Sequence, residues 1–157
     1  MKETPLTQGY VALVDDEDYE RVAQFTWHAG IDRRAVYAQR SIARTTVQLH
    51  RLVLEITDAA LQVDHRDHNG LNCQKQNLRV CTNSQNQGNK RKSTRSTSSK
   101  YKGVSWHKQR GKWQATITRL NKFSFLGYFS SEEDAARAYD RAARDHFGGF
   151  AHRNFRD

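Results

Sequence analysis

One stretch of the sequence gathers side chains that could carry out chemistry. Residues 63–86 read VDHRDHNGLNCQKQNLRVCTNSQN, so an Asp-His pair is followed by a series of amide side chains. Hydrolysis of a phosphodiester needs a base that is neutral near neutral pH, which histidine supplies, and carboxylate or amide oxygens can hold a hard divalent cation. His65 is therefore a candidate general base, and Asp64 and Asn86 are candidate ligands of one metal ion.

Whether these side chains can act together depends on the local structure. Successive residues of a strand point to opposite faces, so Asp64 and His65 border one cleft only if their strand ends there. Asn86 falls one turn inside the following helix, where it can face Asp64. The alternative is that Asp64, Asn72 and Asn77 only make hydrogen bonds within turns. That alternative is the better explanation of any one of them, whereas the whole set favours a catalytic site.

The elements that would position this set form a strand, a loop, a second strand and a helix. Residues 61–65 and 78–81 are strand candidates, and the Asn-Gly pair between them is a turn signal. Thr82 and Gln85 have the spacing of a capping box, which begins a helix. Ahead of them, residues 1–60 predict a small β-rich part, with strands at 10–14, 25–29 and 36–42, a short helix ending near residue 23 and a helix at 47–56.

The pattern DHxxxNxLN…NLR…N, between about residues 50 and 89, resembles that of the HNH endonuclease family. The motif of that family is a β-hairpin and a helix around one metal ion. The resemblance implies that His65 is the general base and that Asp64 and Asn86 hold the metal. It also implies that Asn77 orients the histidine and braces the hairpin.

The sequence departs from the family pattern within the loop. Cys73 stands where family members often have Asn, and His68 stands where Gly is common. These changes affect the shape of the loop more than the metal site. His50 lies on the polar side of a predicted helix, where a lone histidine is more often a packing residue than a catalyst. We therefore expect His50 to have a supporting role at most.

The expected cofactor is Mg²⁺ or Mn²⁺, with one ion in each active site. Cys73 and Cys81 form neither a disulfide framework nor a four-ligand zinc site, which fits an intracellular, reducing setting. A zinc site that combines them with His65 and His68 is the alternative. Such sites use paired ligands at tight spacing, however, and each sulfur here stands alone. We therefore expect no structural zinc.

The charge is distributed unevenly along the chain. The net charge is +9, but residues 1–60 contain seven Lys or Arg and nine Asp or Glu, whereas residues 88–157 contain sixteen and six. A basic half next to a near-neutral half predicts a polyanionic partner, here double-stranded DNA; a solubilising surface is the alternative. Residues 88–100 (GNKRKSTRSTSSK) contain no apolar side chain and predict a flexible linker, whose Lys90, Arg91, Lys92 and Arg95 could contact phosphates.

Residues 101–157 predict a three-stranded sheet packed on a helix. Strands are expected at 104–106, 112–118 and 123–129. A capping box at Ser130 and Glu133 begins a helix that ends before Gly148. The small alanines of this helix would pack on one face of the sheet, which leaves the other face for a partner.

This segment resembles the plant-type apetala/ethylene-response-factor DNA-binding domain, through YKGVSWHKQRGKWQATI, FLGYFSSEEDAARAYDRAA and AHRNF. The resemblance implies that the sheet lies in the major groove of DNA. Ser105, Thr116 and Thr118 stand where the plant domains have several arginines, so the base preference should differ. Trp106 and Phe125 could pack on sugars or belong to the core. The expected DNA contacts of the segment are Trp106, Lys108, Arg110, Lys112, Thr116, Thr118, Arg119, Lys122 and Phe125.

Together these patterns predict an α+β protein with a nuclease domain at 1–87, a basic linker at 88–100 and a DNA-binding domain at 101–157. The expected function is that of a metal-dependent DNA endonuclease, resembling the homing-type enzymes of phages and mobile elements. The alternative is a non-catalytic DNA-binding regulator with a degenerate nuclease domain. A monomer should nick DNA, whereas a homodimer could cut both strands. No apolar run is long enough to span a membrane and no signal peptide is evident, so we expect an intracellular, cytoplasmic location, nucleoid-associated in a bacterial or phage-infected cell.

Overall fold

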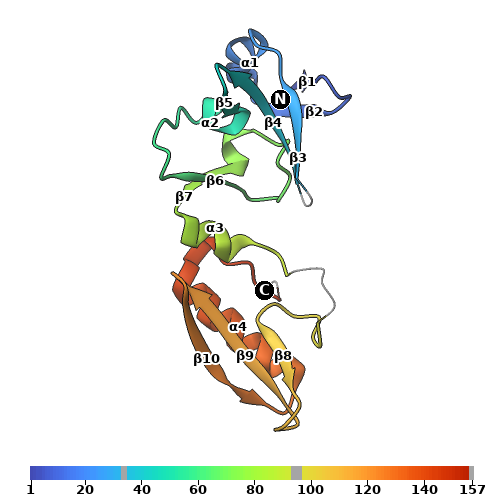
Figure 1. Ribbon diagram of the computed structural model, residues 1–157, viewed down its shortest axis with the longest axis vertical. Coiled ribbons are helices and arrows are strands. Elements are labelled where there is room, and N and C mark those ends of the chain that lie inside the picture. The colour runs from blue at the N-terminus through green and yellow to red at the C-terminus, as the bar shows by residue number, and fades with distance from the viewer. Residues whose placement is uncertain (33–34, 93–96, 156–157) are drawn as a thin grey trace. The chain divides into compact units, whose positions relative to one another are not determined.

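The computed structural model describes residues 1–32, 35–92 and 97–155. The chain forms two compact units, Met1–Thr82 and Asn83–Asp157, each with core clusters of its own. The α+β architecture expected from the sequence is confirmed, with several small antiparallel sheets and mostly short helices (Figure 1). The division falls before the predicted end of the first domain at residue 87, so the helix that carries Asn86 groups with the second unit.

The first unit is built from short strands and two short helices. Its core surrounds Trp27, whose indole N–H donates to the carbonyl of Val22 at 3.0 Å, and includes Val14 and Leu49. Its strands pair antiparallel in three groups, β1 with β2, β3-β4-β5, and β6 with β7. The elements are β1 (Lys2–Pro5), β2 (Val11–Val14), α1 (Asp16–Ala23), β3 (His28–Asp32), β4 (Ala35–Ile42), β5 (Thr45–Gln48), α2 (Leu49–Val53), β6 (Gln62–His65), the 3₁₀ turn η1 (Lys75–Asn77) and β7 (Leu78–Cys81).

Some elements of the first unit differ from the prediction. The helix expected at 47–56 is only α2, because Val47 and Gln48 end β5 and pair with Arg40 and Gln39 of β4. The β-branched residues of β5 favour a strand over a helix. The strand expected at 25–29 begins only at His28. Strand β1 was not predicted, since its sequence KETP has no apolar alternation, and it forms by pairing with β2.

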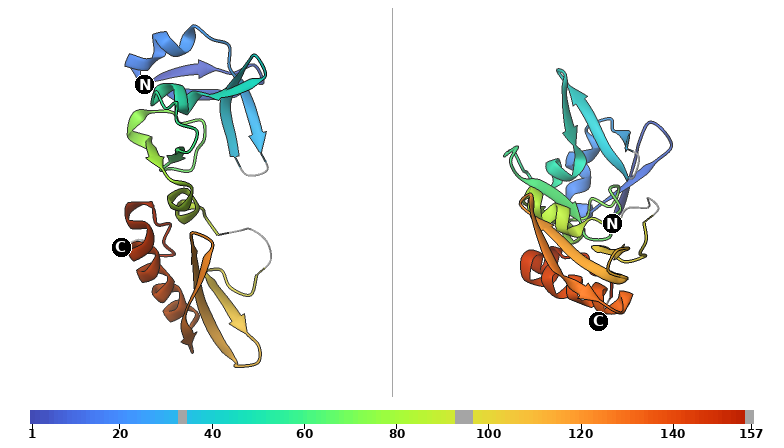
Figure 2. Two further views of the ribbon diagram at one scale, coloured as in Figure 1. Left: turned by 60° about the vertical axis from the view of Figure 1, so that its left-hand side comes forward. Right: turned by 60° about the horizontal axis from the view of Figure 1, so that its bottom comes forward.

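The second unit packs a long helix on a three-stranded sheet, as expected. Both views in Figure 2 show α4 along one face of the sheet, whose strand order is β10-β9-β8. Ser131, one residue later than predicted, caps α4 by accepting hydrogen bonds from the N–H groups of Glu133 and Asp134, and Gly148 ends it at φ 55°. The elements are α3 (Asn83–Asn89), β8 (Val104–His107), β9 (Lys112–Arg119), β10 (Lys122–Phe129), α4 (Glu132–Phe147) and the 3₁₀ turn η2 (Gly148–Phe150).

Parts of the predicted linker belong to the second unit. Gly88 lies so close to Phe147 that a Cβ there would be 2.5 Å from the ring. Ser99 is buried and its hydroxyl donates to Glu132 at 2.7 Å. The Lys102 ammonium donates to the carbonyl of Gly88 at 2.8 Å. Gly88 and Ser99, near the two ends of the predicted linker, therefore contact residues of the second unit. Arg95 lies outside the described residues.

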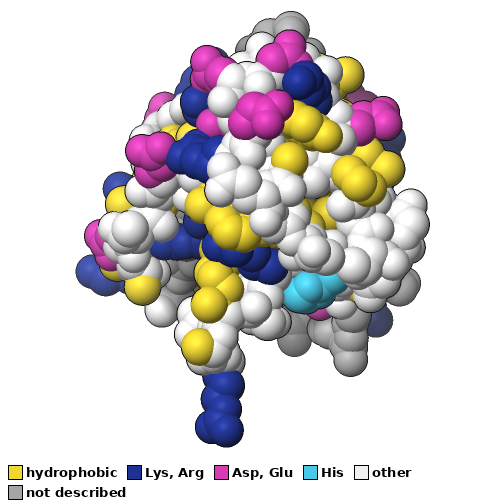
Figure 3. All heavy atoms as spheres, turned by 90° about the horizontal axis from the view of Figure 1, so that it is seen from above, with side chains coloured by type: hydrophobic (Ala, Val, Ile, Leu, Met, Phe, Trp, Pro, Cys, Tyr) yellow, Lys and Arg dark blue, Asp and Glu magenta, His cyan; other side chains and the backbone are white. Residues whose placement is uncertain are grey.

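The surface charge of the first unit is mixed. Figure 3 views the molecule from the end that carries α1 in Figure 1, and shows Asp and Glu side chains among Lys and Arg. The mixture agrees with the near-neutral charge of residues 1–60. Within the described parts of the chain, the helices are too short or too polar to cross a bilayer.

Candidate active site

The β6–β7 hairpin places the Asp-His pair. Its register pairs Asp64 with Arg79 and His65 with Leu78. The Arg79 Nε–H donates to Asp64 Oδ2 at 3.0 Å, and its Nη2 donates to the same oxygen. Asp64 is only 5% exposed. A buried carboxylate needs such a partner because desolvation of an unpaired charge is costly.

His65 is the last residue of β6 and is 6% exposed. Its ring lies against Tyr37 of β4, at a centroid distance of 5.8 Å, and against His50 of α2, at 5.1 Å. Burial lowers the pKa of His65, an effect that Asp67 and Asp64 partly oppose. Its buried Nε2 has no hydrogen-bond partner among the described residues. A neutral imidazole can accept a proton, and a buried polar atom without a partner marks His65 as a candidate functional residue.

His50 packs against the ring of His65. It is buried on α2, and its Nδ1 also has no hydrogen-bond partner within the described chain. Burial lowers the pKa of His50 to about 3, with smaller contributions from His65 and Arg51. His50 is therefore neutral near neutral pH and packs edge-on against His65.

Asn77 braces the loop between the two strands. Its Nδ2 donates to Asp67 Oδ1 at 3.0 Å and to the carbonyl of Asn72 at 2.8 Å, and its Oδ1 accepts from the Asp67 N–H at 3.1 Å. Although burial raises the pKa of Asp67, hydrogen bonds from Asn69, Asn72 and Asn77 hold that pKa below its usual value. Asp67 is thus the centre of the loop, a role that its place in a turn sequence did not reveal.

Two loop residues have backbone reasons for their identity. His68 has φ 63°, in the left-handed region that favours glycine, which explains why Gly suits this position. Gly70 lies against β4, where a Cβ would be 2.4 Å from the Val36 carbonyl oxygen and 2.6 Å from the Tyr37 ring. Gly70 therefore allows a close approach of the loop to the strand that carries Tyr37.

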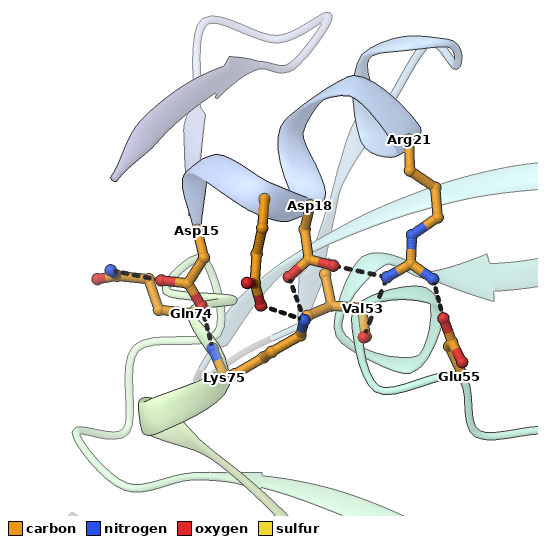
Figure 4. Close-up of polar contacts among 8 residues, drawn as sticks. Asp15, Asp18, Arg21, Val53, Glu55, Gln74 and Lys75 are labelled. Atoms are coloured by element: carbon orange, nitrogen blue, oxygen red, sulfur yellow. Dashed lines mark hydrogen bonds and ion pairs between the residues drawn. The ribbon is translucent and has the colours of Figure 1, made fainter.

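The amino-terminal residues hold the loop at Leu71 and at residues 73–75. Leu13 of β2 donates its N–H to Leu71 O and accepts from Cys73 N–H, both at 2.8 Å. Figure 4 shows Asp15, just before α1, between the side chain of Gln74 and the backbone of Lys75. Asp15 accepts from Gln74 Nε2 at 3.1 Å and from Lys75 N–H at 2.8 Å.

The Lys75 side chain adds ion pairs to the same contact. Its Nζ lies 3.1 Å from the buried carboxylate of Asp18 and 2.5 Å from Glu17, both on α1 (Figure 4). Arg21 pairs with the other oxygen of Asp18 at 2.6 Å. Because Lys75 begins the 3₁₀ turn that ends in Asn77, α1 helps to fix the position of the bracing residue.

The cysteines are packing residues. Both are buried, and burial raises the pKa of Cys73 to about 12 and that of Cys81 to about 11. Without a metal ion, such thiols are protonated near neutral pH. No group of three or more His, Cys, Asp or Glu in the described residues is arranged to hold a metal ion.

The remaining predicted site residues lie in the second unit. Asn86 is on α3, so its pairing with Asp64 stays a prediction. Lys90, Arg91 and Lys92 follow α3 outside regular structure.

The sheet of the second unit presents one face away from α4. Ala115 and Ile117 are buried in the cores that include α4 residues, so their neighbours Thr116 and Thr118 point the other way. Thr116 pairs with Phe125 and Thr118 with Phe123, and paired residues share a face. We call these four residues, with Gln114, the outer face. The predicted contacts Lys108, Arg110, Lys112, Arg119 and Lys122 are all exposed. By alternation Lys112 shares the outer face, whereas Arg119 and its pair Lys122 follow the row of Ile117.

Trp106 differs from the other predicted contacts. It pairs with Trp113, with ring centroids 5.0 Å apart, in the row of side chains that faces α4. Its ring is still 40% exposed. Phe125 lies on the outer face and is half exposed, so the core alternative for Phe125 is wrong.

One similarity to a known protein extends over almost the whole chain. No protein-family model matches it. Over 149 residues, 92% of this chain and 74% of the relative, it is 31% identical to an uncharacterised HNH endonuclease, L560, of Acanthamoeba polyphaga mimivirus. The chain therefore belongs to the HNH endonuclease family.

A second similarity is confined to part of the chain. It is 46% identical over 59 residues to the ethylene-responsive transcription factor WRI1 and 57% identical over 47 residues to the AP2-like ethylene-responsive transcription factor PLT2, both of Arabidopsis thaliana. These matches cover 36% and 29% of this chain. The chain spans only 14% and 8% of the lengths of those two proteins.

Proposed function

We propose that this protein is a metal-dependent DNA endonuclease of the homing type, with its nuclease site on the β6–β7 hairpin and its DNA-targeting surface on the β8–β10 sheet. The observation that carries the proposal is the neutral, buried His65 with an unused Nε2 next to Asp64. Membership of the HNH family supports the reaction class. The exposed cations around a free sheet face support DNA as the substrate.

In the proposed reaction, His65 takes a proton from the attacking water. Burial keeps the imidazole neutral before the reaction, and the nearby carboxylates of Asp67 and Asp64 favour the imidazolium that forms. Tyr37 and His50 limit the rotation of the ring by packing against it. Asn77 maintains the loop that follows His65 and so keeps the hairpin end in place.

Asp64 and Asn86 would hold the metal ion. A carboxylate and an amide oxygen suit Mg²⁺ or Mn²⁺, and the buried charge of Asp64 fits a cationic neighbour. When bound, such an ion neutralises charge on the scissile phosphate and stabilises the leaving oxygen. Arg79 shares one oxygen of Asp64 and would orient the carboxylate from the hairpin side.

A plasmid-nicking assay tests the catalytic part of the proposal. With Mg²⁺, the wild-type protein should convert supercoiled plasmid to the nicked form, and His65→Ala should slow this by a factor of about 10²–10⁴. His68→Gly is the matched control, because it removes a neighbouring histidine and suits the local φ of 63°. Equal nicking by wild type and His65→Ala would contradict the assigned base.

Manganese binding can be tested without relying on activity. Paramagnetic Mn²⁺ should broaden the amide NMR signals of Asp64, His65 and Asn86 in the ¹⁵N-labelled chain. Asp64→Asn should abolish the broadening at all three residues. Broadening that persists in this variant, or that spares Asn86, would show that the ligand pair is wrong.

The targeting part is tested by the salt dependence of DNA binding. Replacement of Arg110 and Lys112 by Gln should lower the slope of log K against log [salt] by about 0.9 for each phosphate that the protein no longer neutralises. Lys2→Gln, on the exposed β1 strand, is the control and should leave the slope unchanged. An unchanged slope in the double variant would mean that the sheet does not contact the backbone of DNA.

One observation favours a second function, that of a DNA-binding regulator with an inactive nuclease domain. Arg79 occupies one oxygen of the carboxylate that would bind the metal. If this ion pair excludes the metal, Mn²⁺ will not broaden the Asp64 signal and no nicking will occur, while the salt-dependent binding remains.

A further inference from the structure

The outer face of the sheet carries hydrocarbon where a DNA-reading surface usually carries hydrogen-bonding groups. Phe123 is 65% exposed and Phe125 is 50% exposed. Each pairs with a threonine of β9, Phe123 with Thr118 and Phe125 with Thr116. The four side chains therefore offer two rings and two methyl groups on one side of β9 and β10.

The surroundings of this face fit a polyanion. Residues 104–129 contain five Lys or Arg and no Asp or Glu. All five cations are exposed, and Arg110 lies over the ring of Tyr128 at 4.8 Å, next to Phe125. An apolar patch on a monomer marks a contact surface, and a rim of one charge indicates the charge of its partner. A nucleic acid duplex therefore fits better than an apolar protein surface.

The chemistry of the major groove limits which bases such a face can contact favourably. Guanine, cytosine and adenine present only hydrogen-bonding groups there, whereas thymine also presents its C5-methyl group. A phenylalanine ring cannot satisfy a donor or acceptor, so it gains free energy only against that methyl group. Gln114 lies on the same face, paired with Tyr128, and Gln can bind adenine through N6 and N7.

We propose that the outer face recognises thymine methyl groups, and that Phe123 and Phe125 direct the protein to A·T-rich DNA. The inference rests on the proposed function, in which this sheet binds double-stranded DNA. Alternate residues of a strand are about 6.8 Å apart, which is the rise of two base pairs. On a strand that follows the groove, the two rings contact thymines two base pairs apart.

Substitution of uracil for thymine tests this directly, because uracil lacks only the methyl group. Binding of the full chain to an A·T-rich duplex is measured by fluorescence anisotropy in EDTA, with thymine or uracil in both strands. Burial of one methyl group corresponds to about a fourfold gain in affinity, so two contacts predict a preference for thymine of about tenfold or more. Phe123→Ala/Phe125→Ala should bring the ratio of the two affinities close to one.

A matched variant separates the two proposals. Lys112→Gln should weaken binding to both duplexes by the same factor, because a phosphate contact does not depend on the base. Salt-dependent binding with equal affinity for the thymine and uracil duplexes would overturn thymine recognition and leave the proposed function intact.

Three other outcomes also contradict the proposal. A preference for thymine that survives in the double phenylalanine variant would place its recognition elsewhere. Tighter binding to single strands, insensitive to uracil, would mean that the rings stack on unpaired bases. If the wild-type chain bound neither duplex, both the inference and the proposed targeting function would be overturned.

Discussion

Removal of the Asp15 carboxylate should loosen the loop that carries Asn77 and slow catalysis without weakening DNA binding. Asp15 accepts two hydrogen bonds, from Lys75 N–H at 2.8 Å and from Gln74 Nε2 at 3.1 Å, across 60 and 59 residues of sequence. These bonds connect β2 and α1 to the 3₁₀ turn Lys75–Asn77. Asp15→Ala removes both acceptors at once.

The expected size follows from the environment of the two bonds. Hydrogen bonds to a charged group contribute about 1.5–3 kcal/mol each, but Asp15 is only half-buried and water can replace part of the loss at Lys75. We therefore expect local opening to become easier by about 2 kcal/mol in total. That corresponds to about 30-fold faster hydrogen exchange at the amides of Lys75 and Asn77.

The consequence for activity is a change in kcat rather than in KM. A small displacement of the loop would move the hairpin end that carries His65, and misplacement of a catalytic group by about 1 Å can cost about 100-fold in rate. Asp15→Asn keeps one acceptor for Lys75 N–H and should recover part of the exchange protection and of the rate.

The neighbouring Asp16 supplies the control. Its side chain is 67% exposed and pairs only with the amino terminus among its described contacts, at 2.9 Å. Asp16→Ala should change exchange and nicking little. If Asp15→Ala behaves like Asp16→Ala in both assays, the loop does not depend on this contact and the reasoning is refuted.

Three further outcomes are expected. Arg79→Ala removes the charged partner of buried Asp64 and should lower the stability of the first unit by about 3–5 kcal/mol, measured by thermal unfolding. Millimolar Mg²⁺ should restore part of this stability. An unchanged Tm would contradict the pairing of Arg79 with Asp64. Burial lowers the pKa of His50 to about 3 in the folded chain. Below about pH 6.5, His50 therefore binds a proton in the unfolded chain but remains neutral in the folded chain. The free energy of unfolding is therefore not reduced by His50 above pH 6.5 and should fall by about 2 kcal/mol between pH 6.5 and pH 5. His50→Leu should reduce this dependence on pH, which a series of denaturation curves at different pH values would measure. Gly103→Ala should destabilise the second unit far more than Gly111→Ala. Both positions have positive φ, but only a Cβ at residue 103 would meet an aromatic ring, at 2.0 Å. Similar Tm values for the two variants would contradict the close packing of Gly103.

The sequence predicted the elements with strong local signals. β7 has the predicted bounds, Leu78–Cys81, and α4 ends at the predicted Phe147, because alternation, capping and glycine signals lie within the elements themselves. The apolar spacing over 47–56 predicts a helix that begins within β5. Only the ladder to β4, a contact distant in sequence, decides in favour of a strand there.

In the candidate site, too, contacts between residues distant in sequence could not be predicted from local signals. Asp64 and His65 stand out because acid, imidazole and amide side chains are mostly exposed in proteins, so a run of them does not fit a core. Arg79 was visible in the sequence only as part of the NLR pattern, although the strand register that pairs it with Asp64 could have been inferred from the two predicted strands. Tyr37 and Asp15 carry no local signal, since nothing in their immediate neighbours shows that they will contact residues of the hairpin.

The burial of the Asp-His pair explains why the short β6–β7 hairpin needs the sixty residues before it. Two strands of four residues are marginally stable on their own, and a buried carboxylate next to a neutral imidazole with an unused nitrogen adds a cost. The first sixty residues supply what the hairpin lacks. Tyr37 and His50 pack against the ring of His65, and Asp15 holds the loop at Lys75. The polar site is therefore maintained by contacts outside the motif, so variants of this amino-terminal part should alter catalysis even though none of its residues has a place in the proposed chemistry.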